Sequence, residues 1–169
     1  NGPAKHGTTW FHVYASAYVI LYGRRYTLAL KYVRRRESLI HVIEGLLRRL
    51  GALNVSVGCL FLDRGFYTID VINYLKVKGI PFVMPVVCRG RSGGVRRLLQ
   101  TKKSYTTEYT MKNMGEHKDA SFFVHVVRIY LKSRYRGKHG GVCYGYAFYP
   151  LYTVSLKKVF DEYRKRFGI

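Results

Sequence analysis

The sequence predicts a mixed α/β fold in which helices cover both faces of a sheet. Three observations lead to this prediction: an apolar helical period over 37–50, a β-α-β block over 55–87, and a region rich in Thr, Tyr, Val and Phe over 104–154. A β-α-β block implies two parallel strands joined by a right-handed crossover, whereas the later region favours antiparallel strands. A mixed sheet with helices on both faces accommodates both.

The N-terminal part predicts a hairpin followed by a helix. Residues 9–21 combine aromatic and β-branched side chains, which is typical of a strand. Tyr22-Gly23-Arg24-Arg25 supplies a turn, and residues 26–33 form the second strand. Apolar residues then recur at helical spacing, which predicts an amphipathic helix over 37–50.

The central block predicts a strand over 55–62, a helix over 66–78 and a strand over 80–87. The first of these strands has little polar alternation, as expected for a strand covered on both faces. It ends at Asp63. Because ligands gather at the carboxyl ends of parallel strands in such sheets, Asp63 becomes a candidate functional residue.

The C-terminal part begins with a basic, glycine-containing loop over 89–94. Antiparallel strands follow, most clearly over 122–130 and 142–149, and Ser155 is a good N-cap for a final helix. The chain begins without Met and ends within a helical pattern. We therefore expect one incomplete domain, in which segments 1–90, 91–154 and 155–169 are a core, a β-rich insertion and the start of a last helix.

The charge balance points to a polyanionic partner. The 169 residues carry 30 lysines and arginines against 9 aspartates and glutamates, a net charge of +21, while 48% of the residues are apolar and exclude general disorder. No apolar run is long enough for a membrane helix, and the N-terminus lacks the apolar region of a secretory signal. Three widely spaced cysteines favour a reducing cytoplasm. Nucleic acid is therefore the expected partner, and no membrane.

Basic residues in loops, interleaved with Gly and Tyr, are the candidate contacts to nucleic-acid phosphates and bases. The alternative for any one of them is a solvated surface. The candidates are Arg64, Arg89, Arg91, Arg96, Arg97, Lys102, Lys103, Arg134 and Arg136.

Asp63 has two interpretations. A carboxylate at the end of a buried strand, close to arginines, is arranged to hold a divalent cation beside a phosphate. Alternatively, Asp63 caps the helix that begins near Phe66, with Arg64 as a surface ion-pair partner.

Two sequence blocks resemble a known family. Leu60-Phe61-Leu62-Asp63-Arg64-Gly65-Phe66-Tyr67, followed by Val71-Ile72-x-x-Leu75 and Gly79-Ile80-Pro81-Phe82-Val83-Met84-Pro85, is similar to the block around the second acidic residue of DDE transposases. The likeness is to the IS4-like group, and within it to the ISH3-type insertion-sequence transposases. Tyr163-Arg164-Lys165-Arg166-Phe167-Gly168-Ile169 resembles the start of the group's Tyr-x2-Arg-x3-Glu-x6-Lys signature, with Tyr163 and Arg166 in register.

The resemblance implies an RNase H-like fold in which two Asp and one Glu bind two Mg²⁺ (or Mn²⁺) ions. In that family water, and then a freed 3′-hydroxyl, attacks a phosphodiester at the ends of a mobile element. It implies that Asp63 is the middle acid and a metal ligand, and that Tyr163 and Arg166 act near the active site and on DNA. It also implies a prokaryotic, nucleoid-associated protein that works on DNA as a homodimer or a higher multimer.

The sequence departs from the family at the other two acids. The signature Glu would follow Ile169, no acid precedes Glu37, and Asp161 and Glu162 come about two helical turns too early. We therefore expect this chain not to cleave DNA. The alternatives are a non-catalytic basic nucleic-acid-binding protein, either a decayed transposase or a ribosome-associated module, and a nuclease that does not transpose.

Overall fold

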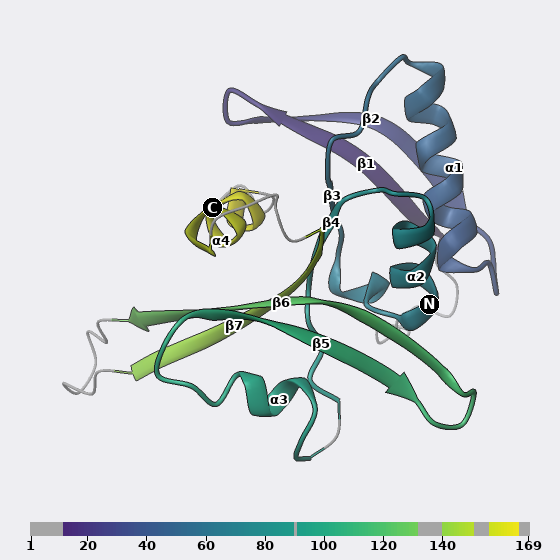
Figure 1. Cartoon of the computed structure of the whole chain (residues 1–169). Coiled ribbons are helices and arrows are strands. Elements are labelled where there is room, and N and C mark those ends of the chain that lie inside the picture. The colour runs from purple at the N-terminus through teal and green to yellow at the C-terminus, as the bar shows by residue number, and fades with distance from the viewer. Residues whose placement is uncertain (1–11, 90, 132–139, 151–155, 166–169) are drawn as a thin grey trace, which may run out of the picture. The chain divides into compact units, whose positions relative to one another are not determined.

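The structure, a computed structural model, describes residues 12–89, 91–131, 140–150 and 156–165. It has a mixed α/β architecture with a five-stranded sheet of mixed direction, as the sequence predicts (Figure 1). Backbone contacts divide the chain into two compact units, with the boundary between Val57 and Gly58. Each unit is described by itself.

The first unit contains a hairpin and one helix. Strands β1 (Val13–Leu21) and β2 (Arg24–Val33) pair antiparallel, with a register shift after Ala17. Helix α1 (Leu39–Ala52) follows the N-cap Ser38, and its buried face packs against the hairpin. The predicted helix is therefore confirmed, although it ends after Gly51 rather than before it.

The connection between β2 and α1 is held by Glu37. Its carboxylate accepts hydrogen bonds from Lys31 Nζ at 2.5 Å and from the Arg34 backbone N–H at 3.0 Å. The Lys31 hydrogen bond and the backbone hydrogen bond of Arg34 both lower the pKa of Glu37.

The second unit is built on a sheet with the strand order β3-β4-β7-β6-β5. The short strand β3 (Leu60–Phe61) is parallel to β4 (Phe82–Pro85), and the remaining neighbours are antiparallel. The other strands are β5 (Tyr105–Asn113), β6 (Lys118–Leu131) and β7 (Gly140–Tyr149). The parallel pair expected from the β-α-β block is therefore confirmed, and so are the antiparallel strands after it.

Several element boundaries differ from the prediction. The strand expected over 55–62 is reduced to β3, because it pairs only with the short β4 among the described residues. The helix expected over 66–78 is divided into a 3₁₀ helix, η1 (Arg64–Phe66), and α2 (Ile69–Val77). Thr68 causes the division, because its hydroxyl accepts a hydrogen bond from the Val71 N–H and caps a new helix there.

Two further helices complete the second unit. Helix α3 (Val95–Leu98) was not predicted, because four residues are too few to show a helical period. Helix α4 (Leu156–Lys165) is the predicted final helix, and its expected N-cap, Ser155, lies outside the described residues. Figure 1 shows α3 and α4 on opposite sides of β6 and β7.

The packing of α4 positions the candidate site. Val159, Phe160 and Tyr163 of α4 are buried against a cluster from three strands of the sheet. That cluster consists of Val83, Val127, Tyr146 and Phe148. Burial of this apolar face holds α4 beside the ends of β3 and β4. Within the described parts of the chain, no helix is both long and apolar enough to cross a membrane.

Candidate functional site

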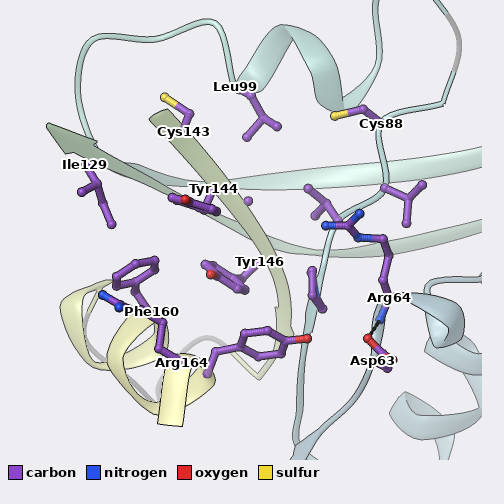
Figure 2. A pocket seen from close by; sticks show the side chains of 15 residues that line it. Asp63, Arg64, Cys88, Leu99, Ile129, Cys143, Tyr144, Tyr146, Phe160 and Arg164 are labelled. Carbon is purple, nitrogen blue, oxygen red and sulfur yellow. Dashed lines mark hydrogen bonds between the residues drawn. The ribbon is translucent and has the colours of Figure 1, made fainter. Parts of the chain in front are cut away.

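A cavity of about 900 Å³ lies at the carboxyl ends of β3 and β4 (Figure 2). It forms because β7 is longer than its neighbour: β4 ends at Pro85, opposite Tyr146, and β7 continues past it. The cavity lies between this continuation, the chain after β3 and β4, and α4. Its lining residues are Asp63, Arg64, Pro85, Val86, Val87, Cys88, Leu99, Ile129, Cys143, Tyr144, Gly145, Tyr146, Phe160, Tyr163 and Arg164.

Asp63 stands at the rim of this cavity, directly after β3. Its backbone is extended, with φ −79° and ψ 162°, and Oδ1 accepts a hydrogen bond from the Arg64 N–H at 2.7 Å. Asp63 is therefore the N-cap of η1, which confirms the expected capping role, whereas the longer helix α2 is capped by Thr68. Capping does not exclude cation binding, because a carboxylate offers two oxygens and about four lone-pair sites.

Tyr163 connects α4 to the strand that carries Asp63. Its side chain is buried, and its hydroxyl donates a hydrogen bond to the backbone carbonyl of Leu62 at 3.2 Å. Leu62 directly precedes Asp63, so two of the three residues that the family resemblance singles out lie next to one another in the fold. They are brought together by α4, across about one hundred residues of chain.

The wall of the cavity beside Tyr163 is aromatic. The ring of Tyr146 lies 5.1 Å from that of Tyr163 and 6.3 Å from that of Phe160, centroid to centroid. Burial, together with the neighbouring phenols of Tyr163 and Tyr144, raises the pKa of Tyr146 to about 12. The Tyr146 phenol therefore stays neutral over the physiological range.

Two arginines lie at the cavity, Arg64 after β3 and Arg164 on α4 (Figure 2). The guanidinium carbon of Arg164 lies 5.4 Å from the centroid of the Phe160 ring, within the range of a cation–π contact. Arg164 was not predicted as a site residue. The signal for it is its spacing from Phe160 and Tyr163, which places all three on one face of a helix.

Two thiols also line the cavity, those of Cys88 and Cys143. Cys143 Sγ lies 3.5 Å from the Thr101 carbonyl oxygen and 3.5 Å from Arg128 Nη1, so it joins the loop before β5 to the sheet. The third thiol, Cys59, packs against the α4 cluster, and burial raises its pKa to about 11.

Of the predicted DNA contacts, the structure brings Arg64 and Tyr163 to the cavity with Asp63, and the other described ones do not line it. Arg89 donates a hydrogen bond to the Tyr67 carbonyl at 3.3 Å and lines a separate polar cavity of about 370 Å³. Arg91, Lys102 and Lys103 are exposed in loops, Arg97 is exposed on α3, and Arg96 is half-buried on the same helix. Arg134, Arg136 and Arg166 lie outside the described residues.

Among the residues that the structure describes, those with acidic side chains at the cavity are too few for a two-ion centre. Within the described ranges, no group of three His, Cys, Asp or Glu side chains is placed to hold a metal ion. Asp161 is exposed on α4 and does not line the cavity. Asp63 alone therefore does not fit the two-Mg²⁺ arrangement that the resemblance implies, and we derive no cleavage step through metal ions.

No protein-family model matches the chain, and no curated protein is significantly similar to it.

Proposed function

We propose that this chain is part of the catalytic core of a DDE-type transposase, with an RNase H-like fold, and that it binds DNA across the cavity beside Asp63. One observation carries the proposal. The Tyr163 hydroxyl bonds to the Leu62 carbonyl, so the two sequence blocks that resemble the family meet at one cavity. A shared active site requires such a meeting, although the blocks are far apart in the sequence.

The chemistry of the cavity rim supports a phosphate-containing ligand. Arg64 and Arg164 supply guanidinium groups, which bind phosphate through charge-assisted hydrogen bonds. The aromatic wall offers surfaces on which bases stack. A net charge of +21 adds long-range attraction for a polyanion.

DNA cleavage has a further requirement that DNA binding does not have. In-line phosphodiester displacement of this class needs two metal ions held by several carboxylates. The described residues present one carboxylate at the cavity. We therefore expect the chain to bind DNA and not to cut it. A nicking assay on supercoiled plasmid with Mg²⁺ or Mn²⁺ should be negative, and nicking abolished by Asp63→Ala would contradict this expectation.

The salt dependence of DNA binding tests the proposed site. Each phosphate contact contributes about 0.9 to the slope of log K against log salt concentration. We expect Arg64→Ala and Arg164→Ala each to lower this slope by about one contact, and the double variant by about two.

The matched control is Lys78→Ala, which removes an exposed cation from the end of α2, away from the cavity. It should leave the slope close to that of the unmodified chain. If the two cavity variants bind duplex DNA with unchanged affinity and slope, DNA does not occupy this cavity.

A second candidate function is a non-catalytic basic nucleic-acid-binding protein. The single carboxylate at the cavity among the described residues favours it. The genomic surroundings distinguish the two. A reading frame that extends upstream to an Asp and downstream to a Glu, flanked by inverted repeats, supports the transposase, and a strand-joining assay on the extended protein separates it from a nuclease.

A further inference from the structure

We propose that β5 is a dimerisation edge, along which two copies of the chain pair their β5 strands antiparallel about a two-fold axis at Thr110. This proposal goes beyond the DNA-binding function and does not depend on it. It rests on the position of β5, the direction of its backbone groups and the order of its charges.

β5 is the last strand of the five-stranded sheet. It pairs with β6 over nine residues, from Tyr105 opposite Val126 to Asn113 opposite Lys118, without any shift of register. On its other side, no strand in the described parts of the chain pairs with it. Proteins usually protect such edges with prolines, bulges, very short strands or charged side chains, and of these β5 has only the charges of Glu108 and Lys112.

The outward backbone groups of β5 can be identified from one hydrogen bond. The Arg128 N–H donates to Ser104 Oγ at 2.9 Å, so the N–H of Arg128 points toward the β5 side of β6. N–H directions alternate along a strand, so Val126 points the same way and forms a hydrogen-bonded pair with Tyr105. The even-numbered residues of β5 therefore direct their N–H and C=O groups away from the sheet.

A second hydrogen bond agrees with this assignment. The carbonyl of Glu108 accepts a hydrogen bond from its neighbour's hydroxyl, Thr107 Oγ1, at 3.3 Å. A carbonyl that points outward from the edge has no strand to bond with, so a local side chain takes that place. The outward-facing residues are Thr106, Glu108, Thr110 and Lys112.

The order of charges selects one register. When two copies of β5 pair, the residues whose backbone N–H and C=O groups point away from the sheet must lie opposite residues of the same kind. With Thr110 opposite Thr110 of the second copy, Glu108 opposes Lys112 twice, once on each side of the axis. Centring the pair on Glu108 or on Lys112 would instead place like charges opposite one another, which is destabilising.

The other face of β5 favours the same register. It places Tyr109 opposite Met111 of the second copy, and sulfur–aromatic contacts of this kind are favourable. Tyr109 and Met111 are both half-buried in the single chain, so pairing would cover apolar surface that remains exposed. The occupant of the edge is therefore a second copy of this chain.

Sedimentation equilibrium of the full chain, without DNA, tests the proposal. We expect a monomer–dimer equilibrium in which Glu108→Lys or Lys112→Glu raises the dissociation constant about tenfold, because each reversal turns two attractive pairs into repulsive ones. The combined variant, Glu108→Lys with Lys112→Glu, should restore dimerisation. Asp161→Lys on α4 and Lys78→Glu at the end of α2 make the same charge changes away from β5 and should leave the constant unchanged.

Cross-linking tests the register itself. Opposed Cα atoms in a hydrogen-bonded pair lie about 5.5 Å apart, within the range that a disulfide spans. Thr110→Cys should therefore form a disulfide with its own copy on mild oxidation, whereas Thr106→Cys, displaced from the axis, should not. Peptide mapping by mass spectrometry identifies the linked residues.

Three results would overturn the proposal: a chain that stays monomeric at all concentrations, a dimer insensitive to the charge reversals, or association that continues beyond the dimer. Because no DNA is present in these measurements, their failure leaves the proposed DNA site untouched. Unchanged DNA binding in the cavity variants, which would overturn the DNA site, would likewise leave the dimer edge untouched.

Discussion

At the scale of single residues, Asp63 has a structural role and also sets the local charge of the proposed site. Its carboxylate caps η1, and it stands at the rim of a cavity that also presents Arg64 and Arg164. A negative charge beside two cations opposes phosphate binding when no metal is bound, since like charges at contact distance repel. If a divalent cation were bound to it, the same carboxylate would favour phosphate binding instead of opposing it.

This gives a prediction for Asp63→Asn. Asparagine caps helices as well as aspartate does, so the fold should be retained. Removal of one charge at contact distance from a phosphate is worth about 1 kcal/mol in water, so DNA affinity in EDTA should rise about fivefold. Fluorescence anisotropy with a labelled duplex measures the change.

The control is Asp119→Asn, which removes an exposed charge at the start of β6, outside the cavity. It should change the affinity much less. If the two substitutions changed DNA affinity equally, the affinity would depend only on the net charge of the chain, and the DNA would not approach Asp63.

At the scale of elements, the attachment of α4 decides whether the cavity exists. Tyr163→Phe keeps the buried ring and removes the hydrogen bond to Leu62, at an expected cost of about 0.5–1.5 kcal/mol. Amide hydrogen exchange in α4 should become faster, and DNA affinity should fall, because the helix holds one wall of the site.

Tyr105→Phe is the matched control for this substitution. It removes the same kind of hydrogen bond in the same unit, from the Tyr105 hydroxyl to the Leu98 carbonyl at 2.8 Å. The global stability should fall by a similar amount, but exchange in α4 should not change. If both variants accelerate amide hydrogen exchange in α4 equally, the hydrogen bond from Tyr163 to Leu62 does not hold that helix specifically.

The elements also show what the sequence could and could not predict. The apolar period of α1 and the β-α-β block are local patterns, and both gave the correct element types and the parallel pairing of β3 with β4. The length of β3 was wrong, because strand length depends on the neighbouring strand. The division of the second helix at Thr68 depends on a cap that competes with helical periodicity.

The candidate site was predictable only in part, because local sequence patterns do not encode contacts between distant parts of the chain. Asp63 follows from its place after a strand, and Tyr163 follows from the family resemblance. Their proximity depends on a long-range docking that no local pattern encodes. The contributions of Cys143 and Tyr144 depend on β7 extending past the end of β4, which is a property of sheet register.

At the scale of the whole molecule, the buried cysteine thiol and tyrosine hydroxyls predict that the folded state loses stability at alkaline pH. Burial raises the pKa of Cys59 to about 11 and that of Tyr146 to about 12, above their values in an unfolded chain, and it also raises the pKa of Tyr67. For groups with a raised pKa in the folded state, the stabilising contribution is complete below the unfolded pKa. It is lost as the pH rises toward the folded value, because the unfolded chain releases protons first.

The free energy of unfolding should therefore fall as the pH rises from about 9 to about 11. Urea titrations monitored by circular dichroism measure this fall. Cys59→Ala should reduce the pH dependence over that interval, because it removes the thiol that titrates there. A free energy of unfolding that stays constant over the interval would contradict the burial of these groups.

The docking of Tyr163 on Leu62 also has a consequence for biosynthesis. The two partners are separated by 101 residues, so the ribosome has made the whole sheet before the final wall of the cavity can arrive. Contacts between such distant residues form late and slowly. A nascent or prematurely terminated chain would thus carry its cationic loops without an assembled binding pocket. The proposed ability to bind DNA at the cavity would be acquired only when translation has passed α4.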